Sequence, residues 1–313
     1  MTQYETMYEQ KKMTAEQALQ LIQDHDYMFS AQASGEPAAI LDKLQYLKET
    51  GVKDTIINTC LPLKDYPWLH DQEMKGIMFH NGWFFCGPLR QSQKEKLTSA
   101  VPQRSTTILR HTLDRIRYEG RRPVVLATVS PMDKNGYMTL SVSAIYERDL
   151  INAGALTIVE VNPNFPRTFG DTLVHISEVA AVVESDRPIP CAKLAPYTET
   201  DAAIGRYIAE LIEDGSTIQL GIGNIPNAVA NELKAKKHLG IHTEMFTETM
   251  VDLIECGAVD NSQKGFMNGY SVCSFTMGSQ RLYDFINNNP SVLFKSSTFS
   301  NDPYTIGRNN KFV

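Results

Sequence analysis

The sequence has 313 residues, of which 42% are hydrophobic and 21% are charged, with a formal net charge of −6. This length fits two domains or one large domain, and the apolar content is sufficient for buried cores. The acidic balance argues against nonspecific nucleic-acid binding, which requires a basic surface. The five cysteines are scattered without a Cys-X-X-Cys pair, which argues against a disulfide framework or zinc site and favours a reducing cytoplasm. No apolar run resembles a signal core or reaches the length of a membrane span, so no membrane partner is expected.

The first half of the chain predicts alternating strands and helices. A capped helix is expected over residues 14–23, beginning at Thr14. Residues 27–41 predict a strand, a loop of small residues and a helix start, and such a loop either holds a ligand or simply turns the chain. Further strands are expected at 55–60, 77–85, 123–130, 138–142 and 156–161. This alternation predicts an α/β fold with a mainly parallel sheet.

A proline-rich segment at 185–200 is the best candidate for a domain boundary. It divides the chain into predicted domains at 1–190 and 191–313, whose patterns of helix, strand, small-residue loop and helix are similar. A helix is expected to begin at Thr198 or Thr200 and to end before Gly215. The residues expected on the buried face of this helix are Ile204, Tyr207, Ile208, Leu211 and Ile212.

The segment 217–257 predicts strand, glycine loop, helix, strand and helix. Gly221 and Gly223 make a turn that favours glycine, and Pro226 stands where a first helical residue is expected. The loop is not a phosphate-binding P-loop, because no Gly-Lys-Ser/Thr follows, and Pro226 replaces the third glycine of a dinucleotide fingerprint. Its amides could bind a phosphate or a developing oxyanion, although a purely structural turn fits the spacing equally well.

Glu244 follows the predicted strand 239–243, and the parallel arrangement would place it at the same sheet edge as the glycine loop. A carboxylate there can be a nucleophile, a general base or a metal ligand, whereas an isolated glutamate is more often a solvated surface group. His242 alternates with Glu244 and could face the same side, but two groups do not make a metal site. No Gly-X-Ser-X-Gly nucleophile elbow is present. The residues alone therefore leave a carboxylate enzyme or a ligand-binding α/β protein.

A series of motifs resembles the acetyl-CoA hydrolase/transferase family, and within it the 4-hydroxybutyrate and butyryl-CoA:acetate CoA-transferases. The motifs run in order along nearly the whole chain: Gly-Glu-Pro at 35–37, SPMDKNGYMTLSVS at 130–143, VNPNFPRTFGDTLVHISE at 161–178, QLGIGNIPNAV at 219–229, LGIHTEMF at 239–246, TMGSQRLYDFINNNPSV at 276–292 and NDPYTIGRNN at 301–310.

The resemblance implies two α/β domains of similar topology, the second incomplete, usually assembled as dimers. It implies that Glu244 is the nucleophile and forms a glutamyl-CoA thioester. It further implies that acyl-CoA and small carboxylic acids are substrates, with coenzyme A as a substrate and no metal or permanent cofactor. The oxyanion or CoA-binding loop would comprise Gly221, Ile222, Gly223, Asn224 and Pro226. The substrate pocket would comprise Gly35, Glu36, Pro37, Asn164, Arg167 and His242.

Two departures from the family pattern qualify these expectations. Relatives continue beyond the point where this sequence ends, through a Gly-Gly-Gln segment, which implies a fragment, a truncated product or a missing partner subunit. Glu248-Thr249 stands where relatives usually show Asp-Gly, so the loop beside Glu244 is expected to differ. An acyl-CoA hydrolase on the same scaffold and a non-catalytic CoA-binding subunit are therefore the alternative functions.

Overall fold

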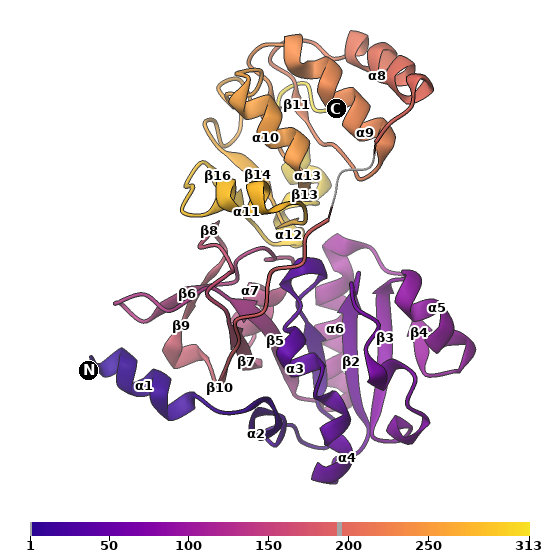
Figure 1. The fold of residues 1–313 in the computed structure, drawn as a ribbon, viewed down its shortest axis with the longest axis vertical. Helices are drawn as coiled ribbons and strands as arrows, with labels where there is room; N and C mark the ends of the chain where they lie inside the picture. Colours follow the sequence, from indigo (N-terminus) through magenta and orange to yellow (C-terminus); the bar gives the residue numbers. More distant parts are fainter. Residues whose placement is uncertain (1, 193–195) are drawn as a thin grey trace. The chain divides into compact units, whose positions relative to one another are not determined.

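A computed structural model describes residues 2–192 and 196–313, which divide into two compact units (Figure 1). Unit 1 comprises Met1–Arg167 and Thr172–Ile189, and unit 2 comprises Thr168–Asp171 and Pro190–Val313. The chain therefore contributes one short segment to unit 2 before completing unit 1. The division at Ile189/Pro190 falls inside the proline-rich segment.

Unit 1 is organised around a seven-stranded sheet in the order β10-β7-β5-β1-β2-β3-β4. Every neighbouring pair in this sheet is parallel, which confirms the predicted fold class. The strands are β1 (Tyr27–Ser30), β2 (Thr55–Cys60), β3 (Met78–Phe84), β4 (Thr98–Ala100), β5 (Pro123–Val129), β7 (Leu156–Val161) and β10 (Ala181–Glu184). β5 is apolar along almost its whole length because it lies between β1 and β7 with its side chains buried on both faces.

The helices of unit 1 connect these strands, as parallel pairing requires. They are α1 (Gln3–Lys11), α2 (Ala15–Leu19), α3 (Ala38–Leu41), α4 (Leu47–Thr50), α5 (Gly87–Lys94), α6 (Ser105–Glu119) and α7 (Glu147–Asn152). The predicted helix at 14–23 corresponds to α2, where Thr14 and Gln17 form a capping box. It is shorter than predicted and ends at Leu19.

The strand predicted at 138–142 is shorter in the structure. β6 (Tyr137–Thr139) pairs antiparallel with β9 (Leu173–His175) in a separate two-stranded sheet. Ser141 has a positive φ of 58°, which is incompatible with an extended strand. The chain therefore turns here, although the residues themselves have strand-like composition.

Unit 2 contains a second parallel sheet built from very short strands. They are β8 (Phe169–Gly170), β11 (Thr217–Ile218), β12 (Gly240–Ile241), β13 (Met245–Phe246), β14 (Ser271–Cys273), β15 (Phe275–Thr276) and β16 (Val292–Phe294). β11 pairs with β12, a bridge between His242 and Val272 links β12 to β14, and β14 continues to β16 and β8. Phe312 bridges Thr217 on the other side of β11, so residues near position 312 also lie against this sheet.

The helices of unit 2 are α8 (Glu199–Leu211), α9 (Asn224–Glu232), α10 (Glu248–Glu255), α11 (Gln280–Ile286), α12 (Ser297–Ser300) and α13 (Pro303–Ile306). Thr198 caps α8 as predicted, but the predicted apolar face is wrong: Tyr207 is 71% exposed and Leu211 is 81% exposed. α8 instead packs on α9 through Gly205 and Ala209 (Figure 1). A Cβ at Gly205 would lie 2.9 Å from a backbone atom of Ala228, so close helix packing and not side-chain hydrophobicity selects the buried face.

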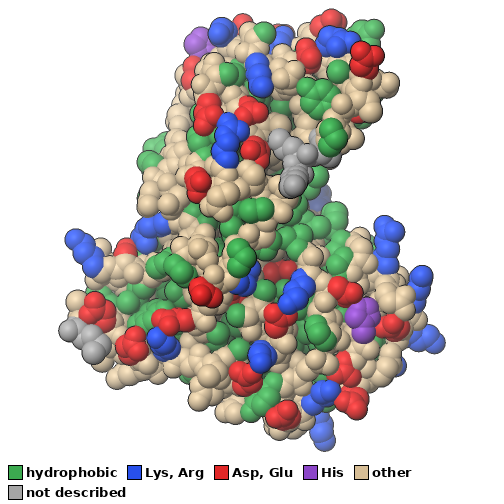
Figure 2. All heavy atoms as spheres, in the orientation of Figure 1, with side chains coloured by type: hydrophobic (Ala, Val, Ile, Leu, Met, Phe, Trp, Pro, Cys, Tyr) green, Lys and Arg blue, Asp and Glu red, His purple; other side chains and the backbone are tan. Residues whose placement is uncertain are grey.

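Acidic and basic side chains are interspersed on the face shown in Figure 2. This distribution is consistent with the modest negative charge of the chain. Within residues 2–192 and 196–313, no helix combines the length and apolar character that a bilayer span needs.

Candidate active site

Glu244 lies at an irregularity between two strand segments. β12 ends at Ile241, and the chain bends at Glu244 before β13 begins at Met245. The Glu244 carbonyl oxygen accepts the amides of both Ser274 (2.8 Å) and Phe275 (3.1 Å). One residue facing two is the pattern of a β-bulge, which redirects a side chain and is common beside active sites. The strand therefore does not end at Glu244, as predicted, but kinks there and continues.

The Glu244 side chain is partly exposed. Its carboxylate has no hydrogen bond or ion pair to another residue in the described part of the chain. A carboxylate with unoccupied lone pairs is available to act as a nucleophile or base.

The glycine loop follows β11, which pairs in parallel with the strand leading to Glu244. α9 begins at Asn224, with Gly223 as its N-cap at a φ of 131°, a conformation that favours glycine. Pro226 is the third helical residue and not the first, as predicted; its missing N–H costs nothing in the first turn. The amides of residues 221–223 donate to no other described residue, so they remain available to a ligand at the helix N-terminus.

A cavity of about 120 Å³ lies beside this loop within unit 2. Its lining residues come from the glycine loop, the β13–α10 turn and two further segments: Ala192, Gly221, Ile222, Gly223, Asn227, Met245, Thr247, Glu248, Met277 and Gly278. Glu244 is adjacent to the lining through Met245 but does not itself contribute to it. Asn224 and Pro226 also lie outside the lining, although they continue the same loop. Glu248, the residue that departs from the family pattern, lines the cavity and lies 3.6 Å from Arg281.

His242 is packed inside unit 2. Its Nε2 donates to the Ser300 carbonyl at 2.8 Å, its ring contacts that of Phe312, and Nδ1 has no partner among the described residues. Burial, together with nearby Lys264, lowers the pKa of His242 despite the opposing effect of the Ser300 carbonyl. The neutral imidazole therefore belongs to the core beneath the strand, and it does not line the cavity.

Lys264 is a fully buried cation that the sequence did not single out. Its Nζ donates to the carbonyls of Ile241 (2.9 Å) and Tyr270 (2.7 Å), which precede the two bulged strands. Burial lowers the pKa of Lys264 to about 8. A Cβ at Gly240 would overlap the Lys264 side chain, so the strand leading to Glu244 lies directly on this lysine.

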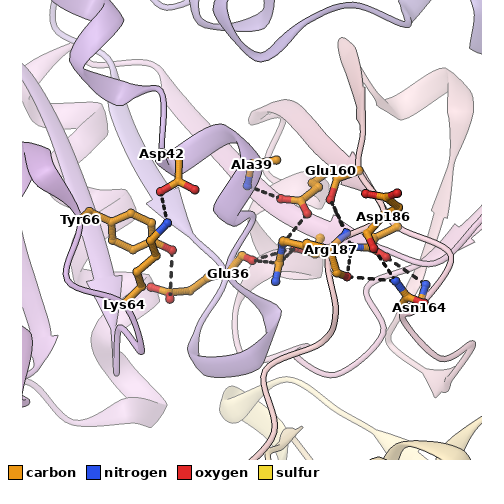
Figure 3. A network of polar contacts seen from close by, with 12 residues as sticks. Glu36, Ala39, Asp42, Lys64, Tyr66, Glu160, Asn164, Asp186 and Arg187 are labelled. Carbon is orange, nitrogen blue, oxygen red and sulfur yellow. Dashed lines mark hydrogen bonds and ion pairs between the residues drawn. The ribbon is translucent and has the colours of Figure 1, made fainter.

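In unit 1, the predicted loop Gly35–Pro37 lies in a buried polar network (Figure 3). Glu36 Oε2 accepts the Leu63 amide (3.2 Å) and the Tyr66 hydroxyl (3.4 Å), whereas Oε1 has no partner among the described residues. Burial raises the pKa of Glu36 to about 8, so its carboxyl is protonated at neutral pH.

The rest of this network depends on Arg187 and Glu160. Arg187 Nη2 donates to the Glu36 carbonyl, and Nε pairs with Glu160 at 2.6 Å. Glu160 also accepts the Ala39 amide at 2.8 Å (Figure 3). The sequence contained one signal for this pair: Glu160 is a single acidic residue in an otherwise apolar buried strand, and such a charge requires a partner.

The remaining predicted pocket residues of unit 1 separate into two places. Asn164 Nδ2 donates to the Arg187 carbonyl at 3.1 Å and so joins the Glu36 network. Arg167 pairs with Asp133 at 2.8 Å, away from that network. Gly35 is required by close packing, because a Cβ there would lie 2.9 Å from that of Ser143.

Parallel sheets, a glycine loop with available amides and a carboxylate on an adjacent strand together define an α/β protein with a carboxylate-centred site. The descriptions "Acetyl-CoA hydrolase/transferase N-terminal domain" and "Acetyl-CoA hydrolase/transferase C-terminal domain" match residues 1–193 and 278–313. The chain belongs to the acetyl-CoA hydrolase/transferase family.

Several relatives are similar over almost the whole chain. A succinyl-CoA:cyclohexane-1-carboxylate CoA transferase from Geobacter metallireducens is 36% identical over 99% of this chain and 69% of its own length. A 4-hydroxybutyrate coenzyme A transferase from Clostridium kluyveri is 35% identical over 99% of this chain and 71% of its own length. Among solved structures, RipA from Yersinia pestis has a TM-score of 0.91 at 29% identity, covering 99% of this chain and 74% of that one. A 4-hydroxybutyrate CoA-transferase from Porphyromonas gingivalis has a TM-score of 0.79 at 27% identity, covering 99% and 73%.

Proposed function

We propose that this chain transfers CoA between a short-chain acyl-CoA and a carboxylic acid through a glutamyl-CoA thioester on Glu244. The observation that carries the proposal is the placement of Glu244 on a bulged strand whose parallel neighbour leads into a glycine loop with available amides. Relatives named as CoA transferases support this reaction over hydrolysis, since those named as acetyl-CoA hydrolases are more distant, at 26% and 29% identity.

The reaction conserves bond energy at each step. A carboxylate oxygen of Glu244 attacks the thioester carbonyl, the C–S bond breaks, and CoA leaves as a thiolate with the bonding electron pair. The thiolate then attacks the Glu244 carbonyl of the resulting mixed anhydride and releases the first acid as a carboxylate. An acceptor carboxylate reverses both steps on the glutamyl-CoA thioester and leaves as a new acyl-CoA.

Each tetrahedral intermediate in this sequence carries a negatively charged oxygen. The amides of Gly221, Ile222 and Gly223 are proposed to stabilise it, assisted by the N-terminal end of α9, which begins at Asn224. Loss of one such donor typically costs about 3 kcal/mol of transition-state stabilisation.

Other parts of the proposal rest on the family relationship. Gly35, Glu36, Pro37, Asn164, Arg167 and His242 remain predicted substrate-pocket residues, and Pro226 remains a predicted part of the CoA-binding loop. We also propose a cytoplasmic homodimer that uses CoA only as a substrate. Catalysis by relatives of greater length leaves open a contribution from a further C-terminal segment or subunit.

Trapping the thioester tests the proposed reaction. The chain is incubated with butyryl-CoA or acetyl-CoA, reduced with borohydride and digested, and the peptide containing Glu244 is analysed by mass spectrometry. We expect reduction of the Glu244 side chain to an alcohol in the wild type and in the surface control Glu210→Gln. An unmodified Glu244 with undiminished transferase activity would rule out this mechanism.

Hydrolysis is the second candidate, because the family and two relatives carry that name. Water would replace the acceptor acid and attack the same thioester. Release of free CoA that is independent of added acetate would favour the hydrolase, whereas acetate-dependent formation of acetyl-CoA would favour the transferase.

A further inference from the structure

The strand order of unit 1 identifies a place where a ligand is expected to bind. From β1 the sheet extends through β2, β3 and β4 in one direction, and through β5, β7 and β10 in the other. Connections therefore diverge between β1 and β5, and open parallel sheets bind ligands outside the carboxyl ends of their strands at such a switch point. The loop that follows β1 there contains Glu36.

Backbone strain gathers around the same loop. Ala33, in the loop after β1, has a φ of 51°, and Leu61, directly after β2, has a φ of 53°. Ser141, two residues before Ser143 that contacts the Gly35 position, has a φ of 58°. Non-glycine residues rarely adopt this conformation, and such strain is concentrated at ligand and active sites.

The Glu36 carboxyl is held rigidly but is incompletely satisfied. Its backbone carbonyl accepts the Thr128 hydroxyl at 2.9 Å as well as Arg187 Nη2, which fixes the loop (Figure 3). Its side-chain Oε1 is buried without a partner, whereas Leu63, whose amide binds Oε2, is 39% exposed. The unpartnered oxygen therefore lies one residue layer below the surface.

We propose that Glu36, as a neutral carboxylic acid, hydrogen-bonds a hydroxyl group on the chain of the acid substrate and so selects hydroxy acids. This inference rests on the proposed transferase function, because it concerns the acid that the enzyme accepts. A protonated carboxyl offers one O–H donor and one acceptor, and a hydroxyl is complementary to both. An unsubstituted acid would leave Oε1 unpaired, which sites built for a polar group reject strongly.

A second carboxylate on the substrate would be disfavoured at this position. The nearby cations already have partners: Lys64 pairs with Asp42, and Arg187 pairs with Glu160. A buried anionic group would therefore lack a counter-charge. The titratable groups that act on Glu36 or respond to it are Lys64, Tyr66, Cys86, Tyr146 and Arg187.

The selection should depend on pH because only the protonated carboxyl can donate. Burial keeps the Glu36 pKa at about 8, so the donor is present at pH 6.5 and lost at pH 9.5. A Glu36→Gln side chain offers an amide donor and an acceptor at both pH values. The glutamine variant should therefore retain selectivity without the pH dependence.

Calorimetric titration of the full chain with 4-hydroxybutyrate, butyrate and succinate tests the proposal. At pH 6.5 we expect 4-hydroxybutyrate to bind about 10- to 100-fold more tightly than butyrate or succinate, and this ratio to fall toward one at pH 9.5. Glu36→Gln should keep the ratio at both pH values, Glu36→Leu should abolish it, and the exposed control Glu49→Gln should behave as wild type.

Equal ratios in the wild type and Glu36→Leu, or no saturable binding of any acid, would overturn the inference. A folded Glu36→Gln variant that loses the preference would do the same, even if Glu36→Leu failed to fold. Titration of Glu244→Gln separates the two proposals: retained preference without acyl transfer by the wild type would leave recognition intact and remove the transferase. Transfer by the wild type without any preference would remove only the role of Glu36.

Discussion

The buried amine of Lys264 has a measurable consequence for stability. Its pKa is about 8 in the folded chain against 10.5 in the unfolded chain. Between these values the unfolded chain binds the proton and the folded chain does not, so the contribution of Lys264 to the free energy of unfolding increases with pH. The full difference corresponds to about 3 kcal/mol.

Lys264→Met should remove this pH dependence. Denaturant unfolding between pH 8 and 10 should show the wild type gaining stability relative to the variant as pH rises, whatever the absolute loss caused by the two unpaired carbonyls. Lys237→Met, which changes an exposed lysine of the same unit, should parallel the wild type. A constant difference between wild type and Lys264→Met across this range would contradict the shifted pKa.

Arg187 is expected to be essential for the stability of unit 1. Arg187→Met leaves the Glu160 carboxylate buried without its counter-charge, which should lower the free energy of unfolding by about 3–5 kcal/mol. Adding Glu160→Gln removes that charge and should restore a substantial part of the loss, as measured by thermal or denaturant unfolding. Additive losses in the double variant would indicate that the pair does not stabilise the fold in this way.

At the scale of single residues, the sequence was most informative where chemistry is unusual at a predictable place. Glu244 and the glycine loop follow short apolar runs, so topology alone indicated that they share an edge. The support from Arg187, Glu160 and Lys264 could not be predicted, because each partner is distant in sequence and depends on the packing of several elements.

At the scale of secondary-structure elements, the strand leading to Glu244 depends on a close approach between backbone and side chain. β12 places Gly240 against the stem of Lys264, where any Cβ would overlap it. The lysine in turn holds the Ile241 carbonyl, three residues before Glu244. The position of the proposed nucleophile therefore depends on a glycine and a lysine that do not contact it.

Gly240→Ala should destabilise unit 2 and reduce acyl transfer. The overpacked strand is expected to lose about 1–3 kcal/mol of unfolding free energy. Combining it with Lys264→Ala should cost less than the sum of the two single variants, because the smaller side chain removes the overlap. Gly87→Ala, where a Cβ meets no neighbour within 4 Å, is the matched control. Strict additivity in unfolding experiments would show that the two positions do not interact.

Elements were predictable where their residues form uniform apolar runs. β2 and β7 occupy the predicted ranges 55–60 and 156–161, since buried parallel strands have no polar alternation to interrupt the signal. The strands of unit 2 contain only two or three residues, so bulges and bridges determine their limits more than composition does. α8 misled the prediction because its buried face is made of small residues.

At the scale of the whole molecule, the chain enters unit 2 briefly at Thr168–Asp171 before it completes unit 1. β8 in this segment pairs with β16, and Asp171 forms a 2.6 Å ion pair with Lys295. Gly170 adopts a φ of 108°, and a Cβ there would overlap the Phe294 carbonyl. This connection therefore has a specific backbone requirement that neither unit alone would impose.

A fragment of residues 1–189 tests how far the two units fold independently. It retains all seven strands of the parallel sheet, so we expect cooperative unfolding and strong hydrogen-exchange protection of β1, β5 and β7. The amides of residues 168–171 should exchange much faster than in the full chain, because β16 is missing. Slow exchange of those amides, or the absence of a cooperative transition, would show that β8 or unit 1 is stabilised differently. The complementary fragment 190–313 leaves β16 with an unpaired edge, and such an edge favours association between molecules. Removal of four residues should therefore affect the solution behaviour of unit 2 more than that of unit 1, which size-exclusion chromatography can compare directly.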